Sequence, residues 1–431
     1  MALPNSGIII PRQSVVGHEA EYVKMFDPPT ASPPTCELLT PTNPVPEFMQ
    51  SLGLASVGIP HTVRPRLLNN TTITAWDGAI ISNFTISDRN LNSPFNKGFY
   101  PAPTLRVPRG SIFHAETQGA GPPPHTIHWH GVEPTPMNDG VGHCSQEVGQ
   151  YTYQWQPNFI GSYFYHCHRN TMQHFEFGLF GFLIIETPDA FDNPGPFGNP
   201  GGYPRRTAAN LQDFKTTFPG WIGGSLATGG PHAMTVPYDA EALWVFDDID
   251  NTWRTDMPNA KSTFPTHGTQ PGVNDQFFFG DFHDFNPNYF FVTGVNFPAA
   301  VGGTAAIPPG VTIPAALNSG VTGMQVSVNA PVNKTIFIRC LCAAYGIVKV
   351  TFPLDVVIIE YDGRAMGVPP LAQYNHAYTV KAGTPIELST ARRFGCLMRS
   401  ATPVNAVATA QFIHQRSNQP VFTGQIPIQI T

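Results

Sequence analysis

The feature that most limits the fold of this chain is the alternation of apolar and polar residues in short segments separated by turns. TTITAWDGAIISNFTISD (71–88) is one such segment, and TLRVPRGSIFHAET (104–117) and YTYQWQPNFIGSYFYHCH (151–168) continue the pattern. A period of two is typical of β-strands with one buried face. The chain has 45 Pro, 40 Gly and only 12% charged residues, and long helices do not tolerate that much proline. We therefore predict an all-β protein of short strands joined by long Pro/Gly-rich loops.

The predicted strands fall into two groups. Residues 1–60 are proline-rich with weak periodicity and predict an extended N-terminal arm. Residues 61–190 carry regular strand and turn signals, which predict a first β-sandwich. Residues 191–235 form a Gly/Pro-rich connector. Residues 236–431 alternate as well as the first group does and predict a second sandwich.

Composition also limits the partners and the compartment. The net charge of −6 and the absence of any Lys/Arg run argue against a nucleic-acid partner. No apolar stretch approaches the roughly 18–20 residues of a membrane span. The start MALPNSGIIIPRQSVVG lacks the basic beginning and apolar core of a signal peptide. The chain is then either cytosolic or a mature form without its leader, and we expect an extracellular or periplasmic protein of the second kind.

Two short stretches concentrate potential metal ligands. The first is PPPHTIHWHG (122–131), and the second begins at Tyr165 as YHCHRNTMQH. Together they contain six histidines and one cysteine, namely His125, His128, His130, His166, Cys167, His168 and His174. Isolated histidines are most often surface or satisfied core residues, and we interpret His114 and His414 in this way. Seven potential ligands at such close spacing indicate metal binding instead.

Strand geometry divides these seven residues into two sets. Residues two positions apart face the same side of a strand, so Cys167 faces away from the histidines on either side of it. His125 lies at an odd offset from His128, and we expect it on the side of Cys167. We expect His174 to return to that side through the loop RNTMQ. The first set is then His125, Cys167 and His174, and the second set is His128, His130, His166 and His168.

The donor atoms of the two sets suit different copper sites. Two imidazoles and one thiolate are the ligands of a type 1 (blue) copper centre, which often has a weak axial Met. We expect Leu179 in the axial position, where it cannot coordinate, and therefore a relatively high reduction potential. Four imidazoles suit copper that binds dioxygen or nitrite. Zinc is a weaker interpretation, because it prefers a single tetrahedral cage and these sets lie on opposite faces.

The stretch from about 100 to 188 resembles a cupredoxin domain of the multicopper oxidases, the laccase family. HTIHWHG is similar to the HxxHxH ligand motif of the family, and YFYHCH with the later His and GL is similar to its HCH motif. The resemblance implies two Greek-key cupredoxin sandwiches and copper as the cofactor. It assigns type 1 copper to His125, Cys167 and His174, type 2 copper to His128, and the type 3 pair to His130, His166 and His168. It also implies that Asp139, in MNDGV, relays protons to oxygen.

The second group of strands departs from this pattern. NKTIFIRCLCAAYGIVKVTF is similar to a copper-free family domain, and it has Val348, Lys349 and Val350 where a ligand pair could sit. In the family, four histidines from each of two domains make the type 2/type 3 cluster, so one chain here supplies half of it. A homo-oligomer with a two-fold contact between first domains would supply the other half, because such a contact doubles every ligand. A different, ligand-supplying subunit is the second arrangement.

We expect an oxidase that takes single electrons from a small molecule or a redox protein at type 1 copper and reduces dioxygen to water at the cluster. A copper nitrite-reductase-like enzyme and a non-enzymatic type 1 electron-transfer protein are the alternatives.

The six cysteines contain no CxxC motif. A disulfide of Cys340 or Cys342 with Cys396, and one of Cys36 with Cys144, are possible, as is a role as small buried apolar residues. Glycosylation sequons occur at Asn69, Asn70, Asn83 and Asn333.

Overall fold

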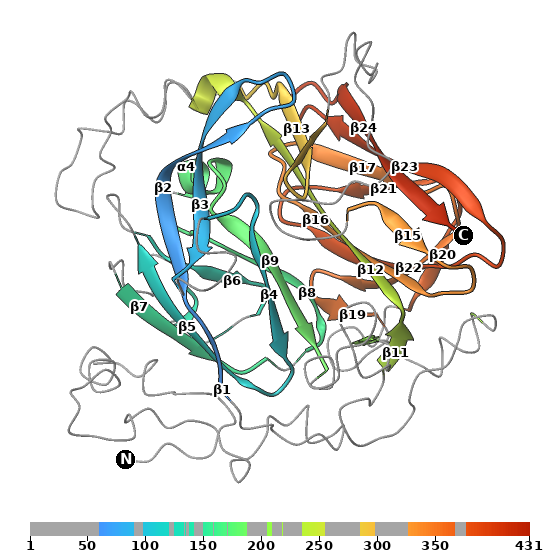
Figure 1. Cartoon of the computed structure of the whole chain (residues 1–431), viewed down its shortest axis with the longest axis horizontal. Coiled ribbons are helices and arrows are strands. Elements are labelled where there is room, and N and C mark those ends of the chain that lie inside the picture. The colour runs from blue at the N-terminus through green and yellow to red at the C-terminus, as the bar shows by residue number, and fades with distance from the viewer. Residues whose placement is uncertain are drawn as a thin grey trace.

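The computed structural model shows two β-sandwiches side by side (Figure 1). It describes residues 60–89, 98–119, 125–132, 134, 138–141, 150–157, 159–169, 171–187, 205–208, 218, 235–254, 285–297, 326–366 and 376–431. Nearly all regular structure in these ranges is strand, which confirms the all-β prediction. The predicted arm lies outside the described residues except for Pro60, which begins a strand. None of the helices in the described ranges is long and apolar enough to cross a bilayer.

The first sandwich packs a five-stranded sheet on a four-stranded sheet. The larger sheet has the order β1-β5-β2-β3 with β7 beside β5, and its strands are β1 (Pro60–Val63), β5 (Ile112–Gly119), β2 (Pro65–Thr74), β3 (Ile80–Asp88) and β7 (Gln150–Trp155). The smaller sheet runs β4 (Ala102–Pro108), β9 (Phe180–Glu186), β8 (Gly161–His166) and β6 (His128–His130). Phe113 and Tyr153 from one sheet and Trp129 and Leu183 from the other meet in the core between them.

The second sandwich has the same plan with a larger sheet. Its eight strands are β14 (Val295–Phe297), β13 (Tyr289–Val292), β12 (Ala240–Ile249), β16 (Ile336–Cys342), β22 (Arg393–Met398), β18 (Val356–Tyr361) and β19 (Arg364–Ala365), with β20 (Tyr378–Val380) beside β18. The facing sheet runs β15 (Val328–Ala330), β24 (Pro420–Ile430), β23 (Val404–Ile413), β17 (Ile347–Thr351) and β21 (Pro385–Leu388).

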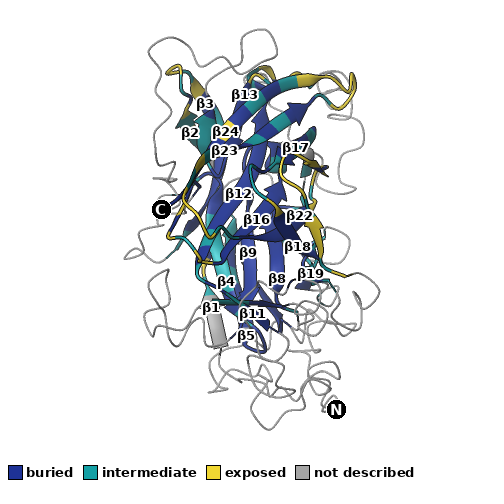
Figure 2. Ribbon diagram, turned by 90° about the vertical axis from the view of Figure 1, so that its right-hand side faces the viewer, coloured by how far each residue is buried: buried dark blue, intermediate teal, exposed yellow. Residues whose placement is uncertain are grey.

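Strands β8 and β9 are buried on both faces, which explains their nearly continuous apolar sequences. Their other face, with Phe164 and Phe180, packs on the second sandwich through Leu243 and Phe291. Figure 2 shows the central strands as buried and the connections at their ends as more exposed. The strand that carries His166 is therefore clamped between two apolar layers.

Polar contacts also fix β8 against the second sandwich. Tyr163 donates its hydroxyl hydrogen to the Gly363 carbonyl at 2.7 Å. Ser162 donates to the Glu360 carboxylate and accepts from Arg339 Nη1 at 2.9 Å. Ser162, Glu360 and Arg339 are all buried, so each polar group is satisfied inside the protein rather than by water.

Two segments that connect predicted strands contain regular structure. In and directly after the predicted connector, β10 (Arg205–Ala208) pairs with β11 (Thr235–Tyr238), and Arg205 lies 3.4 Å from the buried Glu186 carboxylate. Between them, only residue 218 is described. The predicted loop before His174 is a short helix, α4 (Thr171–Glu176), which carries His174 in its last turn.

The described cysteines are buried and form no disulfide. A disulfide of Cys340 or Cys342 with Cys396 is wrong, because the strand register pairs Cys396 with Ile338 rather than with either cysteine. Burial raises the pKa of Cys340 and of Cys396 well above the usual range, as expected of small apolar residues. Cys36 and Cys144 lie outside the described residues.

Candidate metal centre

The first predicted ligand set comes together at one end of the first sandwich. His125 precedes β6, Cys167 directly follows β8, and His174 lies on α4. Cys167 Sγ is 3.1 Å from His174 Nδ1 and 3.7 Å from His125 Nδ1, and the three donor atoms lie within 4.8 Å of one another. All three residues are buried. Two imidazole nitrogens and one sulfur around a space of this size fit a type 1 copper ion.

Leu179 is tied to this group through its backbone. Its N–H donates to the His174 carbonyl at 2.9 Å, and its carbonyl accepts from the Cys167 N–H at 3.0 Å. Gly178, at φ +113°, ends α4 in the left-handed region and turns the chain toward Leu179. The fully buried Leu179 side chain packs in the same core as Cys167 and Phe177. A side chain that cannot coordinate a metal therefore lies beside His125, Cys167 and His174.

The second predicted set lies on the paired strands β6 and β8, where the register places His128 opposite His166. Donor atoms of His128, His130 and His166 lie within 4.8 Å of one another, and His130 Nδ1 is 3.3 Å from His166 Nε2. His168 adjoins this tight group, with its ring centroid 5.1 Å from that of His128. The geometry thus brings together three of the four residues closely and the fourth as a neighbour.

Hydrogen bonds orient two of these imidazoles. His128 Nδ1 lies 2.7 Å from the Asp139 carbonyl and 3.1 Å from Asp139 Oδ1. His166 Nδ1 lies 2.9 Å from the Cys167 carbonyl. A ring whose Nδ1–H donates to an oxygen presents Nε2 to a metal, so these contacts fix the tautomer. Asp139 therefore contacts the second set through His128.

Burial disfavours the charged form of several imidazoles in the two sets. Desolvation, with smaller effects of Arg393 and neighbouring histidines, lowers the pKa of His130 to about 3. Burial likewise lowers the pKa of His166 and of His174 well below the usual range. Only the neutral imidazole coordinates a metal, so His130, His166 and His174 can bind one without first losing a proton, whereas the Cys167 thiol must release its proton on binding.

His114 on β5 is a partly buried histidine outside both sets, 3.0 Å from Gln154 Nε2. Burial lowers its pKa to about 4, despite the opposing effect of Glu116. The unfolded chain then binds more protons than the folded chain between that value and about 6.5, so acid favours unfolding in this window.

We expect the stability of the metal-free protein to fall as the pH decreases through this window, and we expect His114→Gln to make the fall shallower. The histidines of the two sets add to the fall in both proteins. Urea unfolding of both proteins at about pH 7 and about pH 5 measures the difference. An unchanged pH dependence in the variant would show that His114 contributes nothing to it.

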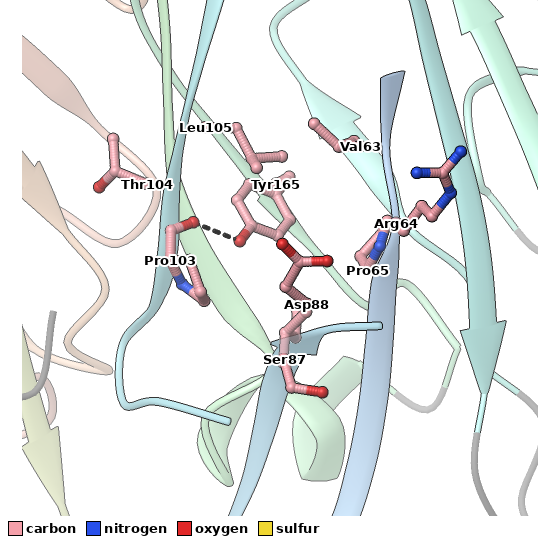
Figure 3. A pocket seen from close by; sticks show the side chains of 10 residues that line it. Val63, Arg64, Pro65, Ser87, Asp88, Pro103, Thr104, Leu105 and Tyr165 are labelled. Atoms are coloured by element: carbon pink, nitrogen blue, oxygen red, sulfur yellow. Dashed lines mark hydrogen bonds between the residues drawn. The ribbon is translucent and has the colours of Figure 1, made fainter. Parts of the chain in front are cut away.

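A cavity of 220 Å³ lies beside β8, the strand that carries Tyr165 and His166 (Figure 3). Its wall includes Tyr165, two residues before Cys167, together with Asp88, Arg64 and Leu105. Tyr165 donates its hydroxyl hydrogen to the Pro103 carbonyl at 2.6 Å, the dashed contact in Figure 3. The cavity thus places polar and apolar groups together beside a strand that leads directly to both ligand sets.

Sequence reasoning did not identify two residues that contact the ligands. The Phe84 ring meets the His174 ring edge-on, with 5.8 Å between centroids. Thr126 Oγ1 accepts from the His168 N–H at 3.3 Å. Thr126 lies inside the histidine motif, so the motif itself was the signal, whereas Phe84 is indistinguishable in sequence from any core residue of a strand.

In the described ranges, both groups of metal-binding side chains belong to the first sandwich. In the second sandwich, the positions where a ligand pair could sit are Val348, Lys349 and Val350. Val348 and Val350 on β17 are fully buried in its core, and Lys349 lies 3.4 Å from Glu387 on the opposite side of that strand. This strand therefore contributes core residues rather than donor atoms.

Comparisons with known proteins agree with the first sandwich as the metal-binding unit. Residues 83–190 match the family model for multicopper oxidase. Copper resistance protein A of Pseudomonas syringae pv. tomato is 30% identical over 116 residues, which cover 26% of this chain and 18% of that protein. Laccase abr2 of Aspergillus fumigatus is 34% identical over 106 residues, which cover 23% of this chain and 18% of that protein. The matches thus span less than a fifth of either relative.

The fold of both sandwiches resembles a solved structure over a longer range. The blue copper oxidase from Nitrosomonas europaea aligns with a TM-score of 0.51 and 17% identity, over 86% of each chain. This likeness confirms the predicted pair of cupredoxin-like sandwiches.

Proposed function

We propose that this chain is a laccase-like copper oxidase, because residues 83–190 match the family model for multicopper oxidase. The observation that carries the proposal is the pair of ligand sets on either side of one strand end. One set offers a buried cysteine sulfur with two imidazoles, and the other offers three clustered imidazoles. Within each of these groups of three residues, the donor atoms lie within 4.8 Å of one another. When copper is bound to both, it supplies one-electron oxidation of a donor and four-electron reduction of dioxygen to water.

Each residue has a proposed role in holding these ions. His125, Cys167 and His174 would hold type 1 copper, and the Leu179 side chain beside them would offer it no donor atom. His128 holds type 2 copper, and the type 3 pair takes His130, His166 and His168. Cys167 is bonded directly to His166 and His168, so a short covalent path connects the two sets. Asp139 contacts His128 Nδ1, and its proposed role is to pass protons toward the second set.

The second set of one chain is half of a type 2/type 3 cluster, so we propose that another chain completes it. His128 and Asp139 retain some exposure, with side chains 16% and 26% accessible, so a partner can approach this face. A two-fold contact between first sandwiches doubles every ligand. A different subunit that supplies four histidines is the other arrangement. The copper content of the native assembly distinguishes both arrangements from an isolated chain.

The cavity beside Tyr165 favours a small molecule as the electron donor. Its 220 Å³ is below the roughly 300–1,000 Å³ of pockets for drug-sized ligands. A single-ring donor such as a phenol suits this volume. An extracellular or periplasmic location is part of the same proposal, and fractionation of the source cells tests it.

Oxygen uptake tests the proposed reaction. We expect the copper-loaded protein to consume dioxygen when a phenolic donor is added, and to leave nitrite unchanged under anaerobic conditions with the same donor. Nitrite turnover without oxygen uptake would identify a nitrite-reductase-like enzyme. A blue protein that is reduced by the donor but consumes neither oxidant would be an electron-transfer protein.

A further inference from the structure

A single arginine from the second sandwich reaches the helix that carries His174. Arg254 follows β12 in a helical turn that begins after Asp250. Asp250 Oδ1 accepts from the Thr252 N–H at 2.9 Å and its carbonyl accepts from the Arg254 N–H at 3.3 Å, which is the geometry of a helix N-cap. The side chain of Arg254 is completely buried. The backbone of Arg254 is therefore held in place by the second sandwich.

The guanidinium group bonds to two elements of the first sandwich. Nη2 donates to the carbonyl of Glu176, the last residue of α4. Nη1 donates to Asn83 Oδ1 at 2.5 Å and to the Ser82 carbonyl at 3.1 Å, both on β3. Arg254 Nε also lies 3.7 Å from Glu176 Oε1. One planar group thus links α4 to β3, which the rigid fork of arginine donors allows.

These contacts lead directly to the first ligand set. An arginine that donates to the last carbonyls of a helix caps its C-terminus, and His174 is two residues from the capped end. The Phe177 carbonyl accepts from the Phe84 N–H at 2.7 Å, and the Phe84 ring contacts the His174 ring. Arg254 therefore bonds to Glu176, two residues after His174, and to Asn83, the residue before Phe84.

We propose that Arg254 is a positioning residue that holds His174 in the geometry of the first ligand set. Through it, the second sandwich sets how tightly a metal binds in the first. α4 is only six residues long, too short to be stable by itself, so its orientation depends on contacts outside the helix. Residues behind metal ligands typically change metal affinity or activity by roughly 10–100-fold. This inference rests on the proposed function for the identity of the metal.

The same contacts have a consequence for Asn83. Its side chain is fully buried, accepts from Arg254 and donates to the Phe84 carbonyl at 2.8 Å. Its sequon is therefore no glycosylation site in the folded chain, because a glycan cannot be attached without breaking the link from Arg254 to β3.

The test compares Arg254→Lys with the full-length wild-type protein. Lysine keeps the charge but replaces the planar fork with one compact ammonium group, which cannot occupy the Nη1 and Nη2 positions together. We expect copper(II), titrated into the metal-free protein against a competing chelator, to bind the first set roughly 10–100-fold more weakly. We also expect an altered visible spectrum and faster amide hydrogen exchange in the segment 171–179 of the metal-free variant. Asn83→Ala, which removes one acceptor and leaves Arg254 in place, should shift the same quantities in the same direction.

Arg339→Lys is the matched control. Arg339 is also a fully buried arginine between the sandwiches, but it bonds to Ser162 and Glu241 rather than to α4. This control should lose stability while its affinity, spectrum and exchange in 171–179 stay at wild-type values. Wild-type values in both Arg254→Lys and Asn83→Ala would overturn the inference, as would equal changes in Arg339→Lys. If wild-type protein shows no thiolate–copper colour, the proposed function fails, and amide exchange still tests the role of Arg254.

Discussion

Cys167→Ser should abolish the intense visible absorption of the copper-loaded protein together with oxidation of the donor. The sulfur is the central donor of the first set, 3.1 Å and 3.7 Å from the two imidazole nitrogens. A serine hydroxyl has nearly the same volume but does not ionise near neutral pH, so the thiolate that gives blue copper its colour is lost while the fold is kept. Absorption spectra and oxygen uptake measure the two losses.

Cys340→Ala is the matched control for this substitution. Cys340 is an equally buried free thiol in the second sandwich, outside both ligand sets. Its removal should cost some stability and leave the colour and the oxygen uptake intact. Blue colour that survives in Cys167→Ser would refute the assignment of type 1 copper.

His130→Ala should separate the two sets. The His130 imidazole stacks on Phe164 and lies 3.3 Å from His166, so its removal takes a donor from the second set and leaves the first untouched. We expect oxygen uptake to fall by more than roughly 100-fold, the upper range for residues that only support ligands. The visible absorption and the rate of reduction by a donor under anaerobic conditions should remain.

His114→Ala is the control for a lost histidine in the same sandwich. It leaves both ligand sets complete, so oxygen uptake should stay near the wild-type rate. The stability should decrease, because Gln154 loses its hydrogen-bond partner. Loss of colour along with oxygen uptake in His130→Ala would mean that the two sets are not independent.

The predictable part of this protein is the part that depends on local periodicity. Alternation in 71–88 predicts the paired strands β2 and β3. Successive side chains of a strand point in turn to the core and to solvent, which gives the sequence a period of two. The same parity separates Cys167 from His166, and the structure places these neighbours in different groups of donor atoms. The structure groups the first predicted set and three of the four histidines of the second, with His168 as a neighbour.

The rest depends on contacts between residues far apart in the sequence. RNTMQHFE is too short to show a helical period, and α4 is stabilised by Gly178 and by a bond from Arg254, 78 residues from Glu176. In sequence, Arg254 is an isolated basic residue that resembles any exposed one. Strand β10 likewise forms because a distant partner, β11, is available to it. No local pattern marks such residues before the sandwiches meet.

The copper content of the native assembly, counted together with its mass, tests the central claim most directly. Two chains related by a two-fold axis would hold two type 1 sites and one shared three-copper cluster, which is about 2.5 copper ions per chain. We predict this value, and a mass of at least two chains, for protein that consumes dioxygen. A monomer that contains copper only at the first set would contradict the account, because a cluster completed between chains could not then exist.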